Sequence, residues 1–79
     1  MPHEIINPVK MQAVSLPGRH FVVELREHRR RLPGSHFLME GFSVQVREQG
    51  QDGLECRTSA IMDRSAADSF FEMCVKGDK

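Results

Sequence analysis

Two segments in which apolar residues recur at every second position flank Pro33 and Gly34. One segment covers residues 20–27 and the other covers residues 41–48. This period in β-branched and aromatic residues is typical of a half-buried strand. Proline followed by glycine favours a type II turn, because glycine accepts the positive φ that this turn requires. Residues 19–48 are therefore predicted to form one long β-hairpin.

The predicted turn also sets the register of the hairpin. With a two-residue loop, every inward apolar residue of one strand meets an apolar partner on the other. The three predicted pairs are Phe21 with Val46, Val23 with Val44, and Leu25 with Phe42. A slip by one residue would turn one apolar set to the wrong face. Hairpins prefer the primed turn types, so a longer loop with the same parity is the alternative.

A repeated motif extends this pattern toward the N-terminus. Leu-Pro-Gly-x-His-Phe occurs at residues 16–21 and again at residues 32–37. If the second copy forms a hairpin turn, the first copy is expected to do the same, which predicts a strand over residues 9–16. A helix with proline at its first position is the alternative. Residues 1–8 are predicted to be poorly ordered.

This first strand has a mixed inward face. A tight turn at residues 17–18 puts Val14 on the core face. The same turn puts Gln12 and Lys10 there as well. A β-bulge in an edge strand accommodates such a conflict, because the extra residue changes which side chains face inward.

The third predicted turn lies within residues 49–53, which contain two glycines. An odd number of loop residues, with Gly53 as a bulge, keeps the apolar residues of the next strand on the core face. This strand is predicted over residues 54–62. Its expected inward residues are Leu54, Cys56, Thr58 and Ala60.

A short helix is predicted after the last strand. Asp63 and Ser65 both favour helix starts, and Ser65 with Asp68 resembles a capping box. Residues 66–76 follow, and Gly77 suits the position after the last turn. A helix of this length needs a surface to pack on, and the apolar face of the sheet is the candidate. The apolar stripe at helical spacing consists of Ala67, Phe70, Phe71 and Cys74.

These elements predict an α+β fold, with a three- to four-stranded antiparallel β-meander and one C-terminal helix packed across one face. The chain has 79 residues, which is enough for one small domain over residues 1–79. Burial of Phe70 and Phe71 is expected to stabilise the fold by roughly 1.5–3 kcal/mol each.

Composition restricts the cellular setting. The formal net charge is zero, so no global basic signature points to nucleic acid. No apolar run is long enough to cross a membrane, and the first residues lack the apolar segment of a secretory signal. Two cysteines make no disulfide framework, which predicts a reducing, cytoplasmic setting. Cys56 and Cys74 are both expected to be small apolar fillers of one core.

An apolar cluster lies at the hairpin end, beyond the length that one short helix can cover. Its members are Leu32, Phe37, Leu38 and Met39. An uncovered apolar patch is typical of a contact with another protein or with a second copy of the chain. The alternative is that Ile5 and Ile6 of the N-terminal segment cover this cluster.

Basic residues gather at the same end of the hairpin. Phe37 and Met39 are expected beside Arg30 and His28 on the face opposite the core. Basic residues interleaved with an aromatic ring form the platforms that bind single-stranded nucleic acid. The alternative is a solvated strand end whose charges protect the hairpin from aggregation. The arginines concerned are Arg26, Arg29, Arg30 and Arg31.

The sequence offers no catalytic or metal-binding pattern. His20, His28 and His36 are eight residues apart, which is not the spacing of metal ligands on one helix face, and neither Cys-x-x-Cys nor His-x-x-x-His is present. We expect His20 and His36 to cap backbone groups beside the turns. Neither a nucleophile–base pair nor a glycine-rich phosphate loop is recognisable. The chain is therefore predicted not to be an enzyme and to need no metal or cofactor.

The C-terminal half, residues 41–74, resembles a group of short uncharacterised bacterial proteins, which are classed as domains of unknown function. The resemblance lies in three elements: the strand Gly-Phe-Ser-Val-Gln-Val, the junction Ile-Met-Asp-Arg at residues 61–64, and the short helix that follows. It implies a strand-to-helix junction of the same kind and no particular activity.

We therefore predict a small non-catalytic protein-interaction or regulatory module in the cytoplasm, with an unknown protein partner or a second copy of itself. Binding of nucleic acid by the arginine-rich hairpin end is the alternative. No membrane association is expected.

Overall fold

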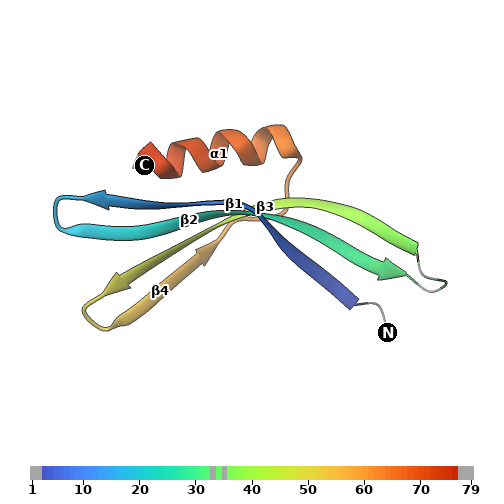
Figure 1. The fold of residues 1–79 in the computed structure, drawn as a ribbon, viewed down its shortest axis with the longest axis horizontal. Coiled ribbons are helices and arrows are strands. Elements are labelled where there is room, and N and C mark those ends of the chain that lie inside the picture. Colours follow the sequence, from blue (N-terminus) through green and yellow to red (C-terminus); the bar gives the residue numbers. More distant parts are fainter. Residues whose placement is uncertain (1–2, 33, 35, 77–79) are drawn as a thin grey trace.

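The computed structural model describes residues 3–32, 34 and 36–76. The side chains of His3, Leu32, His36 and Phe37 lie outside the described part. Four antiparallel strands form one sheet in the order β1-β2-β3-β4, and a C-terminal helix packs across one face (Figure 1). This confirms the predicted α+β meander. The elements are β1 (His3–Leu16), β2 (Arg19–Leu32), β3 (His36–Gly50), β4 (Gly53–Thr58) and α1 (Arg64–Lys76).

The core lies between α1 and the two central strands. β2 and β3 supply four buried apolar side chains, and α1 supplies two. Removal of such side chains from water is the main stabilising contribution in a domain of this size. The buried core residues are Phe21, Val23, Leu25, Val44, Ala67 and Phe71.

The helix covers only one half of the long strands. Thirteen residues of helix span about 20 Å, whereas fourteen residues of strand span about 46 Å. The molecule extends 50 Å along its longest axis, so a large part of the sheet continues past the helix (Figure 1). We call the helix-covered half the body. We call the other half the arm, which consists of residues 3–8 of β1, 26–32 of β2 and 36–41 of β3.

The central hairpin has the predicted parity but a different register. Val23 pairs with Val46 and Leu25 with Val44, which is two positions away from the predicted partners. Three residues separate β2 from β3, and Glu40 is an extra residue in the ladder between the pairs on either side of it. Together these two features shift the register by two residues. An even shift leaves each apolar set on its predicted face.

The first strand confirms two predictions and corrects one. Val14 pairs with Phe21 across a tight turn, and a bulge between Pro8 and Lys10 interrupts this edge strand as expected. Lys10 lies on the helix side, where its ammonium group is 4.6 Å from the ring centre of Phe71. The prediction of a poorly ordered start is wrong for residues 3–8, because these residues form the outer end of β1 and pair with β2.

The predicted inward face of the last strand is wrong. Gly50 pairs with Gly53, which leaves a loop of two residues instead of an odd number. This register places Leu54 opposite Gln49 and Cys56 opposite Arg47, on the face away from α1. Leu54 is 64% exposed. The strand also ends at Thr58, and one antiparallel bridge between Phe42 and Met62 continues the edge of the sheet.

The helix starts two residues earlier than predicted. Asp63 is the N-cap, because its side-chain oxygen Oδ1 accepts a hydrogen bond of 2.8 Å from the N–H of Ala66. The capping box at Ser65 is therefore not formed. Ala67 and Phe71 are buried, but Phe70 is 41% exposed, so its predicted place in the core is wrong. The expected role of Gly77 lies outside the described residues.

Candidate functional site

In the arm, the outer side of β3 has no neighbouring strand among the described residues. β3 is bonded to β2 on one side, and β4 with the bridge at Met62 occupies its other side from Phe42 to Gly50. Between His36 and Gly41, no strand among the described residues lies along this outer side. We call this segment, residues 36–41 of β3, the open edge.

Exposed apolar side chains project from the open edge. Leu38 is 50% exposed and Met39 is 46% exposed. Ile5 and Ile6 are half-buried and pair alongside β2 on the far side of the arm. They extend the sheet and leave Leu38 and Met39 uncovered. The side chains of Leu32 and Phe37, which were also predicted for this cluster, lie outside the described part of the chain.

Glutamates neutralise most of the arginines that were considered for nucleic-acid binding. Arg26 lies 3.2 Å from a carboxylate oxygen of Glu24. Arg29 lies 2.7 Å from Glu27, and Arg30 lies 2.7 Å from Glu40. Arg31 is exposed and forms no ion pair with the residues that the structure describes. The arm is therefore a surface of alternating charge rather than a strongly basic patch.

The extra residue Glu40 also changes which residues of the arm share a face. Met39 pairs with Arg29, and the register places Phe37 opposite Arg31. Both positions therefore lie on the face that carries α1 in the body, and the prediction that they lie beside Arg30 and His28 is wrong. The basic neighbours of positions 37 and 39 are therefore Arg31 and Arg29 instead of Arg30 and His28.

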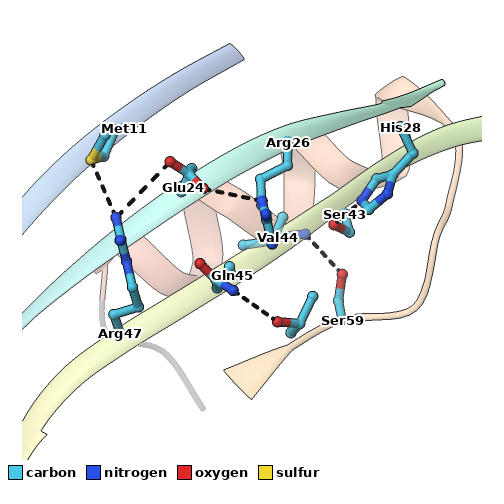
Figure 2. A network of polar contacts seen from close by, with 10 residues as sticks. Met11, Glu24, Arg26, His28, Ser43, Val44, Gln45, Arg47 and Ser59 are labelled. Atoms are coloured by element: carbon cyan, nitrogen blue, oxygen red, sulfur yellow. Dashed lines mark hydrogen bonds and ion pairs between the residues drawn. The ribbon is translucent and has the colours of Figure 1, made fainter. Parts of the chain in front are cut away.

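A buried polar pair lies where the arm joins the body. Nε2 of His28 is 2.6 Å from Oγ of Ser43, and both residues are buried (Figure 2). Nδ1 of His28 has no hydrogen-bond partner among the described residues. No sequence pattern predicts this pair, because the two residues are fifteen positions apart and belong to different strands. A serine beside a histidine is the arrangement of an activated nucleophile, but Ser43 is 0% exposed and a substrate has no access to its hydroxyl.

The same junction contains a close backbone approach. A Cβ atom at Gly41 would lie 2.6 Å from Cγ2 of Ile61 and 2.8 Å from the carbonyl oxygen of Met62. Gly41 also has φ of 140°, which side chains rarely permit. Glycine at this position lets the segment after β4 pack directly on β3.

In the body, charged side chains contact one another on the face of the sheet away from α1. Glu24 lies 4.0 Å from Arg47, whose guanidinium is 3.6 Å from the sulfur of Met11 (Figure 2).

At the end of the body, Arg19 donates two hydrogen bonds to the carboxylate of Glu48, of 2.9 and 2.8 Å. These bonds lower the pKa of the Glu48 carboxyl below its usual range.

The histidines and cysteines form no joint site in the described part of the chain. No group of three or more potential metal ligands comes together among these residues. Nδ1 of His20 is 2.9 Å from Oγ of Ser15, so this histidine contacts a side chain across the turn rather than capping the backbone as predicted. His36 lies outside the described side chains.

The two thiols lie in different environments. Cys74 is half-buried, and burial raises the pKa of its thiol. Cys56 is exposed on the face away from α1, so the prediction that both thiols fill one core is wrong for Cys56. Both cysteines are free thiols.

Comparisons of the chain with protein-family models, with curated proteins and with solved structures find no match. The resemblance of residues 41–74 to uncharacterised bacterial proteins therefore stays a prediction. Within the described part of the chain, no helix is long and apolar enough to cross a membrane. The open edge and its exposed apolar side chains are the candidate site.

Proposed function

We propose that this chain is a small non-catalytic protein-interaction module that associates with a second copy of itself through the arm. The observation that carries the proposal is the exposure of Leu38 and Met39 beside a strand edge with no neighbour in the described structure. Unpaired main-chain groups next to apolar side chains are a template for another strand. A reducing, cytoplasmic setting suits the two free thiols.

A contrast between the open edge and the other outer edges of the sheet supports this proposal. The outer edge of β1 contains Pro8, a bulge at Val9 and the charged Lys10. Each of these features discourages pairing with another strand. The open edge has one charged residue, Glu40, at its bulged inner end, and residues 36–39 contain neither proline nor lysine. The outer edge of β4 carries two charged residues among its six. The open edge is therefore the least protected of the strand edges that the structure describes.

Analytical ultracentrifugation of the full chain, from low micromolar to millimolar concentration, tests the proposal. The wild-type chain is expected to form a dimer whose fraction rises with concentration. Leu38→Glu is expected to abolish association, because two glutamates would be buried at the contact. Leu54→Glu is the matched control, since Leu54 is even more exposed but lies in the body, and it should associate like wild type. A wild-type monomer at millimolar concentration, or equal weakening by both variants, would contradict the proposal.

Nucleic-acid binding by Arg26, Arg29, Arg30, Arg31 and Phe37 remains the alternative function. The ion pairs of three of these arginines weaken its support, because each nearby glutamate repels phosphate. Fluorescence anisotropy with short labelled single-stranded RNA and DNA distinguishes the two functions. Binding that weakens with salt and is lost when residues 29–31 are changed to glutamate would favour the alternative over self-association.

A further inference from the structure

The alternation of main-chain groups along β3 determines how a second strand can join the open edge. In an antiparallel pair, successive residues turn their N–H and C=O groups to opposite edges. Phe42 turns its groups away from β2, because they bond with Met62 at 2.8 and 2.7 Å. The extra residue Glu40 shifts this alternation by one position. Residues 37 and 39 therefore turn their N–H and C=O groups outward, and Leu38 turns its groups toward β2.

We infer that two copies of this chain join through β3 as an antiparallel strand pair centred on Leu38. This inference rests on the proposed function and specifies the contact through which the copies associate. A two-fold axis at residue 38 places residue 37 opposite residue 39 of the second copy, and residue 39 opposite residue 37. The outward groups of residues 37 and 39 then meet one another, which satisfies four hydrogen-bonding groups of each copy's open edge.

The residue types in this register suit each other. Leu38 faces Leu38 of the second copy at a non-hydrogen-bonded position, where side chains approach most closely. In this register, Phe37 is opposite Met39 of the second copy, and His36 is opposite Glu40. No two like charges stand directly opposite each other, and such a pair would oppose association. The self-pairing is therefore apolar at its centre and charge-compatible at its ends.

The length of the open edge also matches this contact. The paired segment runs from residue 36 to residue 40 of each copy. It begins where β3 begins and ends before Phe42, whose outer side is occupied by Met62. A register shifted toward Phe42 would collide with the segment after β4. The symmetric register uses the available edge without displacing any strand.

Disulfide trapping of the full chain tests the register. Both native cysteines are first replaced, with Cys56→Ser and Cys74→Ala, and Leu38→Cys is added. Cα atoms at a non-hydrogen-bonded pair are about 4.5 Å apart, which is within the range that a disulfide spans. We expect Leu38→Cys to form a disulfide-linked dimer in a glutathione buffer, as measured by non-reducing electrophoresis and intact mass.

Met39→Cys in the same background is the matched control. Its exposure is nearly the same, but the register places it opposite residue 37 of the second copy, beyond disulfide reach of its own counterpart. We expect at least about tenfold less linked dimer than with Leu38→Cys, because of this geometric limit. Equal yields, or a higher yield for Met39→Cys, would overturn the inferred register. If Leu38→Glu abolishes a dimer that Leu38→Cys does not trap, the proposed function stands and the strand pairing is wrong. A monomeric wild-type chain would reject both.

Discussion

The body and the arm are consecutive halves of the same long hairpin, and they differ in what covers them. Val44 in the body is 1% exposed, whereas Met39 in the arm of the same strand is 46% exposed. Both are apolar residues of β3, which is paired with β2, and both lie on the face of the sheet that carries α1 in the body. The difference comes from α1, which is too short to reach the arm. Alternation in the sequence thus assigns a residue to a face, and the length of the covering element decides whether that face is buried.

The largest expected effect concerns the helix contact that defines the body. Phe71→Ala should destabilise the fold by about 3–5 kcal/mol, because it removes a buried ring and leaves a cavity. A domain of this size has a total stability of only about 5 kcal/mol, so much of the population should be unfolded. Urea unfolding followed by circular dichroism measures the change.

Phe70→Ala is the matched control for this prediction. The ring is 41% exposed, so its removal should cost less than about 1.5 kcal/mol. If the two variants had equal unfolding midpoints, the distinction between the buried and the exposed side of α1 would be wrong.

The next effect concerns the junction between body and arm. Gly41→Ala should cost about 2–4 kcal/mol, because the new Cβ would meet backbone atoms of Met62 and the positive φ would be strained. Gly18→Ala, in the turn between β1 and β2, also has a positive φ but nothing within 4 Å of the added Cβ. It should cost about 1 kcal/mol. Thermal unfolding of both variants tests whether the junction is the more tightly packed of the two sites.

A smaller effect is expected at the buried polar pair of the junction. Ser43→Ala should cost about 1–3 kcal/mol, because His28 then loses its one hydrogen-bond partner among the described residues while it remains buried. Hydrogen exchange of the backbone amides locates the consequence. Faster exchange in the arm than in the body would show that this pair holds the two halves together, and uniform acceleration would argue against that role.

The smallest effect is a pH dependence at the far end of the body. The folded pKa of Glu48 is lowered by Arg19, so this pair stabilises the fold above the ordinary glutamate pKa of about 4.3. The contribution is lost as the pH falls through the lowered folded pKa. Glu48→Gln should therefore be less stable than wild type at neutral pH, and the difference should shrink as the pH falls through the lowered folded pKa of Glu48. Urea midpoints across this range measure it, and a constant difference would exclude the mechanism.

Local turn chemistry made part of the fold predictable. The tight turn at Pro17 and Gly18 determines the pairing of Val14 with Phe21 by itself, because only two residues separate the strands. The conflict at Lys10 predicted a bulge, and the structure has one beside it. In the central hairpin the parity was predictable from alternation, but the register was not, because alternation is unchanged by a shift of two residues.

The last strand and the helix show why other details were missed. Leu54 was expected in the core, but α1 makes its main contacts with β2 and β3. A Leu54 side chain on the α1 side would therefore lose little exposed area. The two-residue loop between Gly50 and Gly53 then sets the register. Phe70 and Phe71 are about 100° apart around the helix, and the stripe pattern did not reveal which ring faces the sheet.

The candidate site was predictable in position but not in its chemistry. The length of the hairpin relative to one short helix indicated that Leu38 and Met39 would extend past the core. The ion pair between Arg30 and Glu40 depends on the bulge, and no turn motif in the sequence predicts a bulge at this position. The contact between His28 and Ser43 depends on the exact pairing of β2 with β3, which the predicted register did not contain.

The order of elements along the chain has a consequence for synthesis. Strands β1 to β4 are neighbours in both sequence and space, so each hairpin can pair as soon as it leaves the ribosome. The two buried residues of α1, Ala67 and Phe71, follow all four strands in the chain. At about 5–20 residues per second, the nascent sheet therefore spends about a second or more with its apolar face open to water and to chaperones.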